Sequence, residues 1–106
     1  MSFTLDDLAS IIRSRRDASG EVSYTKKLFD GGPSLIGKKL GEEAFETVIA
    51  ALAQDSDALT REAADLVYHL LVLLEAKGVT PAEVLAELYR RTAQSGLAEK
   101  ASRGVS

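Results

Sequence analysis

Acidic side chains recur at helical spacing in two segments of the chain, and these residues are the best suited to chemistry. At about 100° per residue, Glu42 and Glu46 fall in one narrow stripe of a helix, with Glu43 on its flank. In a second segment, the spacing i, i+3 places Glu62 and Asp65 on a single helix face. The candidate metal-binding residues are Glu42, Glu43, Glu46, Glu62 and Asp65.

The second acidic stripe lies in a segment, from Ala63 to Leu74, that is otherwise almost wholly apolar. A buried carboxylate without a partner must take up a proton or find a cation. If the two acidic helices pair as an antiparallel hairpin, their stripes can face each other, and added positive charge is needed to stabilise them. Several carboxylate oxygens without sulfur ligands are the donor set of a hard cation such as Mg²⁺. The sequence therefore predicts a Mg²⁺ site suited to phosphoanhydride hydrolysis.

Basic residues near the first acidic stripe are candidates for binding phosphate through their positive charge. Charge and position add three further residues to this group. The candidate phosphate contacts are Lys38, Lys39, Tyr24, Lys100 and Arg103. His69 follows Asp65 by one helical turn, and we interpret it as a hydrogen-bonding neighbour of the site or a core histidine rather than a metal ligand.

The surrounding pattern predicts an all-α fold class with four main helices that would position these residues. Thr4 and Asp7 resemble a helix-starting box, and Thr80, Pro81 and Glu83 form a second helix-start signature. Residues 17–33 mix Gly, Ser and Pro, which predicts a loop with a short helical turn that could act as a lid. In the remaining segments, apolar residues recur every three or four positions. The expected helices cover about 5–16, 34–53, 59–76 and 81–93.

Composition and charge limit the classes of function. The 106 residues, of 11.3 kDa, are expected to form a single domain, 1–106. A formal charge of −3 gives no support for nucleic-acid binding, and the lack of cysteine excludes a zinc finger. We find no signal-peptide pattern and no apolar run long enough for a membrane span, so we expect no membrane partner and a cytoplasmic location.

The apolar residues from Leu66 to Leu74 lie around more of their helix than one small core can cover. A domain of this size also buries only a modest core by itself. We therefore expect a homodimer that completes the helical bundle.

The motifs Glu43-Ala44-Phe45-Glu46 and Glu62-Ala63-Ala64-Asp65 resemble the paired acidic motifs of the MazG-type all-α nucleotide pyrophosphatases. Further segments, spread over nearly the whole chain, are similar to the phosphoribosyl-ATP pyrophosphatase family of histidine biosynthesis. Val67 is the one departure, at a position where Leu is expected. The segments that carry the resemblance are 23–28, 31–32, 38–43, 62–69 and 95–103.

The resemblance implies hydrolysis of phosphoribosyl-ATP, as small-molecule substrate, to phosphoribosyl-AMP and pyrophosphate, with Mg²⁺ as cofactor. All five acidic residues named above match the metal-binding acidic positions of the family. The residues that we expect to be catalytic are Glu43, Glu46, Glu62 and Asp65.

The residues alone leave other interpretations open. The first acidic stripe could be a solvated helix face, in which Lys38 and Glu42 form an ordinary i, i+4 pair. The chain could be a MazG-like hydrolase of noncanonical nucleoside triphosphates, or a non-catalytic helical dimerisation module whose acidic stripes meet basic residues of a partner. A di-iron carboxylate bundle is disfavoured because it needs Glu-x-x-His on two helices and the sequence has 1 histidine.

Overall fold

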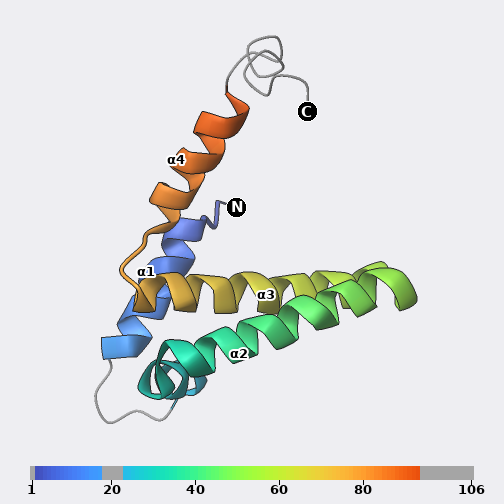
Figure 1. Ribbon diagram of the computed structural model, residues 1–106, viewed down its shortest axis with the longest axis horizontal. Helices are drawn as coiled ribbons and strands as arrows, with labels where there is room; N and C mark the ends of the chain where they lie inside the picture. The colour runs from blue at the N-terminus through green and yellow to red at the C-terminus, as the bar shows by residue number, and fades with distance from the viewer. Residues whose placement is uncertain (1, 18–22, 94–106) are drawn as a thin grey trace.

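The computed structural model describes residues 2–17 and 23–93, and within these residues all regular structure is helical (Figure 1). This confirms the predicted all-α class with four helices. Lys100 and Arg103 lie outside the described residues. The helices are α1 (Leu5–Asp17), α2 (Tyr24–Ala53), α3 (Ser56–Ala76) and α4 (Pro81–Thr92).

Helix α1 begins with the predicted box. The Asp7 N–H donates to Thr4 Oγ1 at 3.0 Å, and the Thr4 N–H donates back to Asp7 Oδ2 at 3.0 Å. At the other end of α1, Arg13 and Arg16 form ion pairs of 3.3 Å and 3.4 Å with the half-buried Glu75 of α3. The last turn of α1 is thereby attached to the last turn of α3.

Helix α2 begins at Tyr24, so the prediction of a loop over residues 17–33 is wrong from that residue onward. Ser23 caps the helix by accepting a hydrogen bond from the Lys26 N–H at 3.0 Å. The chain leaves helical geometry only at Gly32, with φ 79° and ψ 177°. Pro33 then follows, at a first-turn position where its missing N–H costs no hydrogen bond. The breaker residues therefore bend a long helix instead of forming a loop.

We expect Gly32→Ala to destabilise the protein by about 1–3 kcal/mol, because its combination of φ and ψ is essentially restricted to glycine. Urea unfolding followed by circular dichroism measures this change. Gly37→Ala is the matched control, since it lies in the helix after the bend and an added Cβ meets nothing within 4 Å. Alanine there should stabilise the protein by about 0.5–1 kcal/mol. Equal effects at the two positions would contradict the assigned bend.

The hydrophobic core joins α1, both halves of the bent α2, and the C-terminal half of α3. Leu28 precedes the bend and Ile36 follows it, and both are at most 1% exposed. The bend lets two turns of α2 that point in different directions contribute to one core. The buried cluster consists of Ile12, Leu28, Ile36, Leu71 and Val72.

Helices α2 and α3 form the predicted antiparallel hairpin, joined at Gln54 and Asp55 (Figure 1). Asp55 caps α3 by accepting a hydrogen bond from the Ala58 N–H at 2.9 Å. Thr80 and Glu83 form the predicted capping box of α4. Helix α4 packs against α1 and diverges from the hairpin, which leaves an open angle between the two arms (Figure 1).

Candidate metal and substrate site

The hairpin brings together three of the predicted acidic residues, one from α2 and two from α3. Glu43, Glu62 and Asp65 each offer a carboxylate oxygen, and these oxygens all lie within 4.8 Å of one another. Glu43 and Glu62 are half-buried and Asp65 is exposed. We call these three residues the acidic cluster. It is open to solvent on the Asp65 side and partly covered by the two helices on the other.

A threonine fixes the two helices beside the acidic cluster. The Thr47 hydroxyl lies 2.7 Å from the Glu43 carbonyl oxygen and 3.1 Å from the Glu62 carbonyl oxygen, and donates between them. Its partners are the backbones of the residues that carry two of the three carboxylates. Thr47 therefore sets the register of α2 against α3 at this point of the hairpin. The sequence offered no signal for this role, because a threonine inside a helix normally bonds within its own helix.

Glu43 carries an unusual carboxylate. In the part of the chain that the structure describes, its Oε2 atom is buried without a hydrogen-bond partner. Burial, followed by the negative charges of Glu46 and Asp65, raises the pKa of the Glu43 carboxyl above its usual value. A buried oxygen without a donor, next to other carboxylates, is costly unless a cation or a proton satisfies it. The oxygen-only donor set fits a hard divalent cation such as Mg²⁺.

The remaining acidic residues lie at the edge of the acidic cluster. Partial burial, and then the charges of Glu46 and Asp65, raise the pKa of the Glu62 carboxyl. Glu46 is itself exposed but stands close enough to act on both Glu43 and Glu62. Glu42 is exposed and outside the acidic cluster, where it forms a 3.7 Å ion pair with Lys39.

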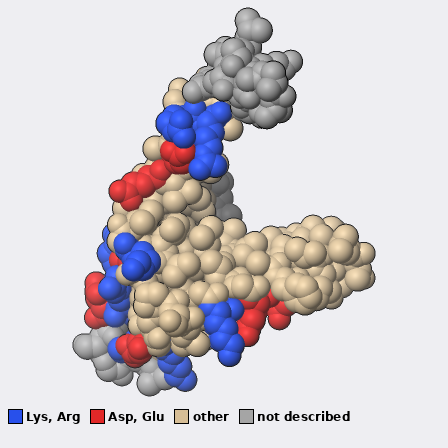
Figure 2. Space-filling view, in the orientation of Figure 1, with Lys and Arg blue, Asp and Glu red and all other residues tan. Residues whose placement is uncertain are grey.

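The structure describes two of the four basic residues that are predicted to contact phosphate. Lys38 is exposed, and Lys39 is half-buried beside Glu42. Figure 2 shows basic and acidic side chains next to each other along one edge of the hairpin, while the outer part of the same arm carries no charged side chain on the visible face. Mixed charge at this edge offers binding partners for both a cation and a phosphate group.

Tyr24 and His69 meet beside the acidic cluster. The His69 ring is buried between α2 and α3, with its Nδ1 atom 2.7 Å from the Asp65 carbonyl oxygen and its Nε2 atom 2.7 Å from the Tyr24 hydroxyl. Burial, and then the charges of Glu43 and Asp65, raise the pKa of the Tyr24 hydroxyl. The expected hydrogen bond between His69 and Asp65 exists, although it uses the backbone carbonyl and not the carboxylate.

The neighbouring residues extend this contact toward α1. The hydroxyl groups of Thr25 and Tyr68 are hydrogen-bonded to each other, and Arg15 donates to the Tyr68 hydroxyl at 3.0 Å. Tyr68 and His69 are consecutive, so α3 binds the first turn of α2 through two adjacent side chains. Sequence reasoning missed this network, because it read residues 24 and 25 as part of a loop.

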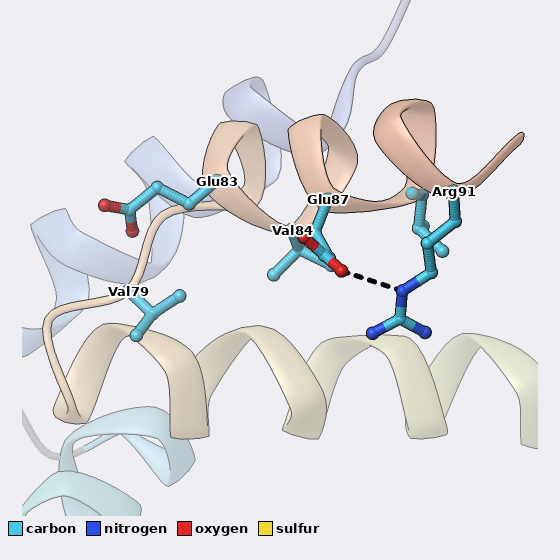
Figure 3. A pocket seen from close by; sticks show the side chains of 6 residues that line it. Val79, Glu83, Val84, Glu87 and Arg91 are labelled. Carbon is cyan, nitrogen blue, oxygen red and sulfur yellow. Dashed lines mark hydrogen bonds and ion pairs between the residues drawn. The ribbon is translucent and has the colours of Figure 1, made fainter. Parts of the chain in front are cut away.

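A separate hollow of about 340 Å³ lies beside α4 and contains none of the predicted site residues (Figure 3). Glu87 and Arg91, both on α4, form a 2.8 Å ion pair along one side of it, and Glu87 also pairs with Arg90 at 2.6 Å. Hydrogen bonds from the two arginines lower the pKa of the Glu87 carboxyl to about 2. These charges therefore satisfy one another, which distinguishes the hollow from the acidic cluster. The residues that line it are Val79, Glu83, Val84, Glu87, Leu88 and Arg91.

Fold and site together define a small all-α protein with a carboxylate cluster held across a helical hairpin. The model of the family described as phosphoribosyl-ATP pyrophosphohydrolase matches residues 5–92. The chain belongs to this family, which confirms the resemblance seen in its motifs.

Individual relatives of this family match the present chain over almost their whole length. The phosphoribosyl-ATP pyrophosphatase of Methylobacterium nodulans is 59% identical over 102 residues, covering 96% of this chain and 95% of the relative. That of Rhizorhabdus wittichii is 57% identical over 103 residues, covering 97% of each chain. That of Agrobacterium fabrum is 55% identical over 102 residues, with coverage of 96% and 95%.

Proposed function

We propose that this protein hydrolyses phosphoribosyl-ATP to phosphoribosyl-AMP and pyrophosphate with the help of Mg²⁺, as the second step of histidine biosynthesis. The observation that carries the proposal is the acidic cluster with its unpartnered, buried Glu43 oxygen. It occurs in a chain 59% identical to a phosphoribosyl-ATP pyrophosphatase. The proposal includes a single catalytic domain over residues 1–106 and a cytoplasmic location. Among the described residues, no helix combines the length and apolar character that crossing a membrane requires.

Glu43, Glu62 and Asp65 are the residues that would hold Mg²⁺, with Glu42 and Glu46 as additional ligands at the edge. When bound, Mg²⁺ offsets the negative charge that develops on phosphoryl oxygens and lowers the pKa of water.

The exposed Glu46 is the carboxylate that we assign as acceptor of the water proton, because it stands beside both Glu43 and Glu62. The water oxygen forms a bond to the α-phosphorus, and the bond between this phosphorus and the bridging oxygen to the β-phosphate breaks. The bridging oxygen leaves with pyrophosphate, and the α-phosphate remains on phosphoribosyl-AMP.

Lysine and arginine side chains complete the proposed phosphate contacts. Lys38 is exposed at the edge of the hairpin, where its ammonium group can reach solvent-side phosphate oxygens. Lys39 already pairs with Glu42 and would exchange this partner for phosphate. Lys100 and Arg103 belong to the same proposal on grounds of charge. Tyr24 differs from these residues, since its hydroxyl is hydrogen-bonded to His69.

Pyrophosphate release from phosphoribosyl-ATP, measured with and without Mg²⁺, tests this function, with ATP and dUTP as competing substrates. We expect Mg²⁺-dependent turnover of phosphoribosyl-ATP and little turnover of the other two. Preference for the simple triphosphates would replace the proposal with a MazG-like hydrolase of noncanonical nucleotides. Lack of turnover with every substrate would favour the helical dimerisation module.

We also propose that the protein is a homodimer, because the hairpin exposes a large apolar surface. Phe45, Val48 and Leu52 lie along one side of α2 and are 67%, 53% and 83% exposed. Large apolar side chains concentrated in one stripe mark an interface more often than a solvated face. A groove of about 210 Å³, lined only by apolar residues of α1, α3 and α4, adds a second uncovered apolar surface.

Val48→Lys should weaken the dimer by about 100-fold or more, because a symmetric interface contains the substitution twice and each copy loses about 1.5 kcal/mol of apolar burial. Size-exclusion chromatography with light scattering measures the mass at micromolar concentration. Ser10→Lys adds the same charge to the exposed face of α1 and should leave the mass unchanged. A monomeric wild-type protein under these conditions would refute the dimer.

A further inference from the structure

His69 is a buried polar residue for which the proposed reaction has no use so far. Its side chain is 4% exposed, and it is the single histidine of the sequence. Both ring nitrogens have a partner at 2.7 Å, namely the Asp65 carbonyl oxygen and the Tyr24 hydroxyl. The Tyr24 ring stands edge-on to the imidazole, with 5.6 Å between ring centroids. A buried ring held at both ends has a defined orientation and a defined proton position.

The two partners determine where the proton of His69 is located. A carbonyl oxygen can only accept a hydrogen bond, so Nδ1 carries the hydrogen and donates to Asp65. In the neutral ring, Nε2 then has a lone pair and accepts a hydrogen bond. The hydrogen bond to Tyr24 therefore has the phenol as donor. With its only proton directed at His69, the Tyr24 oxygen can offer nothing but lone pairs to any further group.

Tyr24 is exposed to solvent and lies within the electrostatic influence of the acidic cluster. It is the first residue of α2, its side chain is 51% exposed, and the charges of Glu43 and Asp65 act on its hydroxyl. The first turn of α2 is separated from the rest of the helix by the bend at Gly32. The bond from Tyr24 to His69 is one of the side-chain contacts that attach this turn to α3.

We propose that His69 is a positioning residue that acts through Tyr24. By accepting the phenolic proton, it holds the Tyr24 oxygen beside the acidic cluster as an acceptor for a hydroxyl group of the substrate. The inference rests on the proposed function, which supplies a substrate with ribose hydroxyls near the scissile phosphoanhydride. A phosphate oxygen is itself an acceptor and gains nothing from this oxygen, so the structure assigns Tyr24 to the sugar side of the substrate instead of its phosphates.

Nitrogen NMR of the metal-free protein labelled with ¹⁵N-histidine tests the hydrogen-bond assignment without any activity. One histidine gives one pair of ring signals, and we expect a neutral ring with hydrogen on Nδ1 and none on Nε2. Tyr24→Phe should shift the Nε2 signal, whereas Tyr89→Phe, which removes an exposed hydroxyl from α4, should not. A doubly protonated ring, the opposite tautomer, or an unchanged signal in Tyr24→Phe would overturn the inference.

Two substitutions of His69 separate its two hydrogen bonds. The amide oxygen of His69→Gln can reach the Nε2 position and accept from Tyr24, whereas the amide nitrogen of His69→Asn replaces Nδ1 and donates to Asp65. We expect His69→Asn to lower kcat/KM by about 10-fold, mainly through KM, and His69→Gln to lose less. Equal losses, or a larger loss for His69→Gln, would show that His69 acts on α3 or Asp65 and would overturn the proposal.

A double-mutant cycle that combines His69→Asn with Tyr24→Phe completes the test. It does not rely only on variants of the buried His69, which could fail to fold. Tyr24→Phe, at a half-exposed position, should itself lower kcat/KM by about 10-fold. In that background His69→Asn should cause no further loss, because its effect passes through the missing hydroxyl. Additive losses would overturn the inference while leaving the proposed function intact. Lack of phosphoribosyl-ATP turnover by the unaltered protein would instead overturn the proposed function, and this role of His69 with it.

Discussion

Glu62→Gln and Asp65→Asn should each lower kcat for phosphoribosyl-ATP hydrolysis by roughly 10³-fold, while helicity stays near that of the wild type. Each substitution removes a negative charge from the acidic cluster, in which the carboxylate oxygens lie within 4.8 Å of one another. Loss of a ligand to the proposed cation removes several kcal/mol of charge stabilisation from the transition state, at about 1.4 kcal/mol per tenfold in rate. Steady-state kinetics at saturating substrate and circular dichroism measure the two quantities.

Matched substitutions separate this effect from a general loss of acidic charge. Glu87→Gln lies on α4, and Asp30→Asn lies on the exposed face of α2, where Asp30 pairs with Lys26 at 3.3 Å. Both remove one carboxylate that does not belong to the acidic cluster, and we expect near wild-type kcat. Full activity in Glu62→Gln or Asp65→Asn would remove that residue from the proposed metal site.

Glu43→Gln should reverse its effect on thermal stability when Mg²⁺ is added. Without metal, we expect the variant to melt higher than the wild type, because it removes a buried negative charge next to Glu46 and Asp65. With Mg²⁺ at about 100 times its Kd, the wild type gains about 2.7 kcal/mol, which raises Tm by roughly 10 °C or more. The variant lacks a ligand and should gain far less. Differential scanning fluorimetry without and with MgCl₂ measures the higher Tm expected of the metal-free variant and its smaller gain from Mg²⁺.

The difference in Tm between Glu43→Gln and the metal-free wild type should depend on pH. The pKa of Glu43 is raised in the folded state, so proton binding at this carboxyl stabilises the folded, metal-free protein. This stabilisation is fully present below the ordinary carboxyl pKa and is lost as pH rises through the raised value. The advantage of Glu43→Gln without metal should therefore be largest near neutral pH and vanish in acid. A constant difference in Tm across this range, or no response of the wild type to Mg²⁺, would contradict the assigned role of Glu43.

The helix ends could be predicted from the sequence wherever a side chain satisfies backbone N–H groups. The boxes at Thr4 and Thr80 are local, and the structure contains both. The start of α2 was missed because Ser23 is followed at the third position by Lys26, which cannot return a hydrogen bond to the cap. Gly32 next to Pro33 further suggested a break in a region where tertiary packing of Leu28 keeps the chain helical.

The meeting of Glu43, Glu62 and Asp65 could also be anticipated, since a short turn between two helices forces antiparallel pairing and helical spacing fixes the faces. The Thr47 bridge and the bond between Tyr24 and His69 could not. They depend on the register between helices and on a bend angle, and neither property is encoded by local spacing. The hydrogen-bonding state of Tyr24 follows only once its partner is known.

The acidic cluster and its Thr47 support all belong to one hairpin, with a short connection at Gln54 and Asp55. Contacts so local in sequence form quickly, so we expect this hairpin to fold early. The acidic side chains of its two helices, however, repel each other as the hairpin closes. This repulsion acts before burial of the core around Ile36 can offset it. Divalent cations should therefore raise the refolding rate, and not merely slow unfolding, so that the acidic cluster would control how fast the molecule forms.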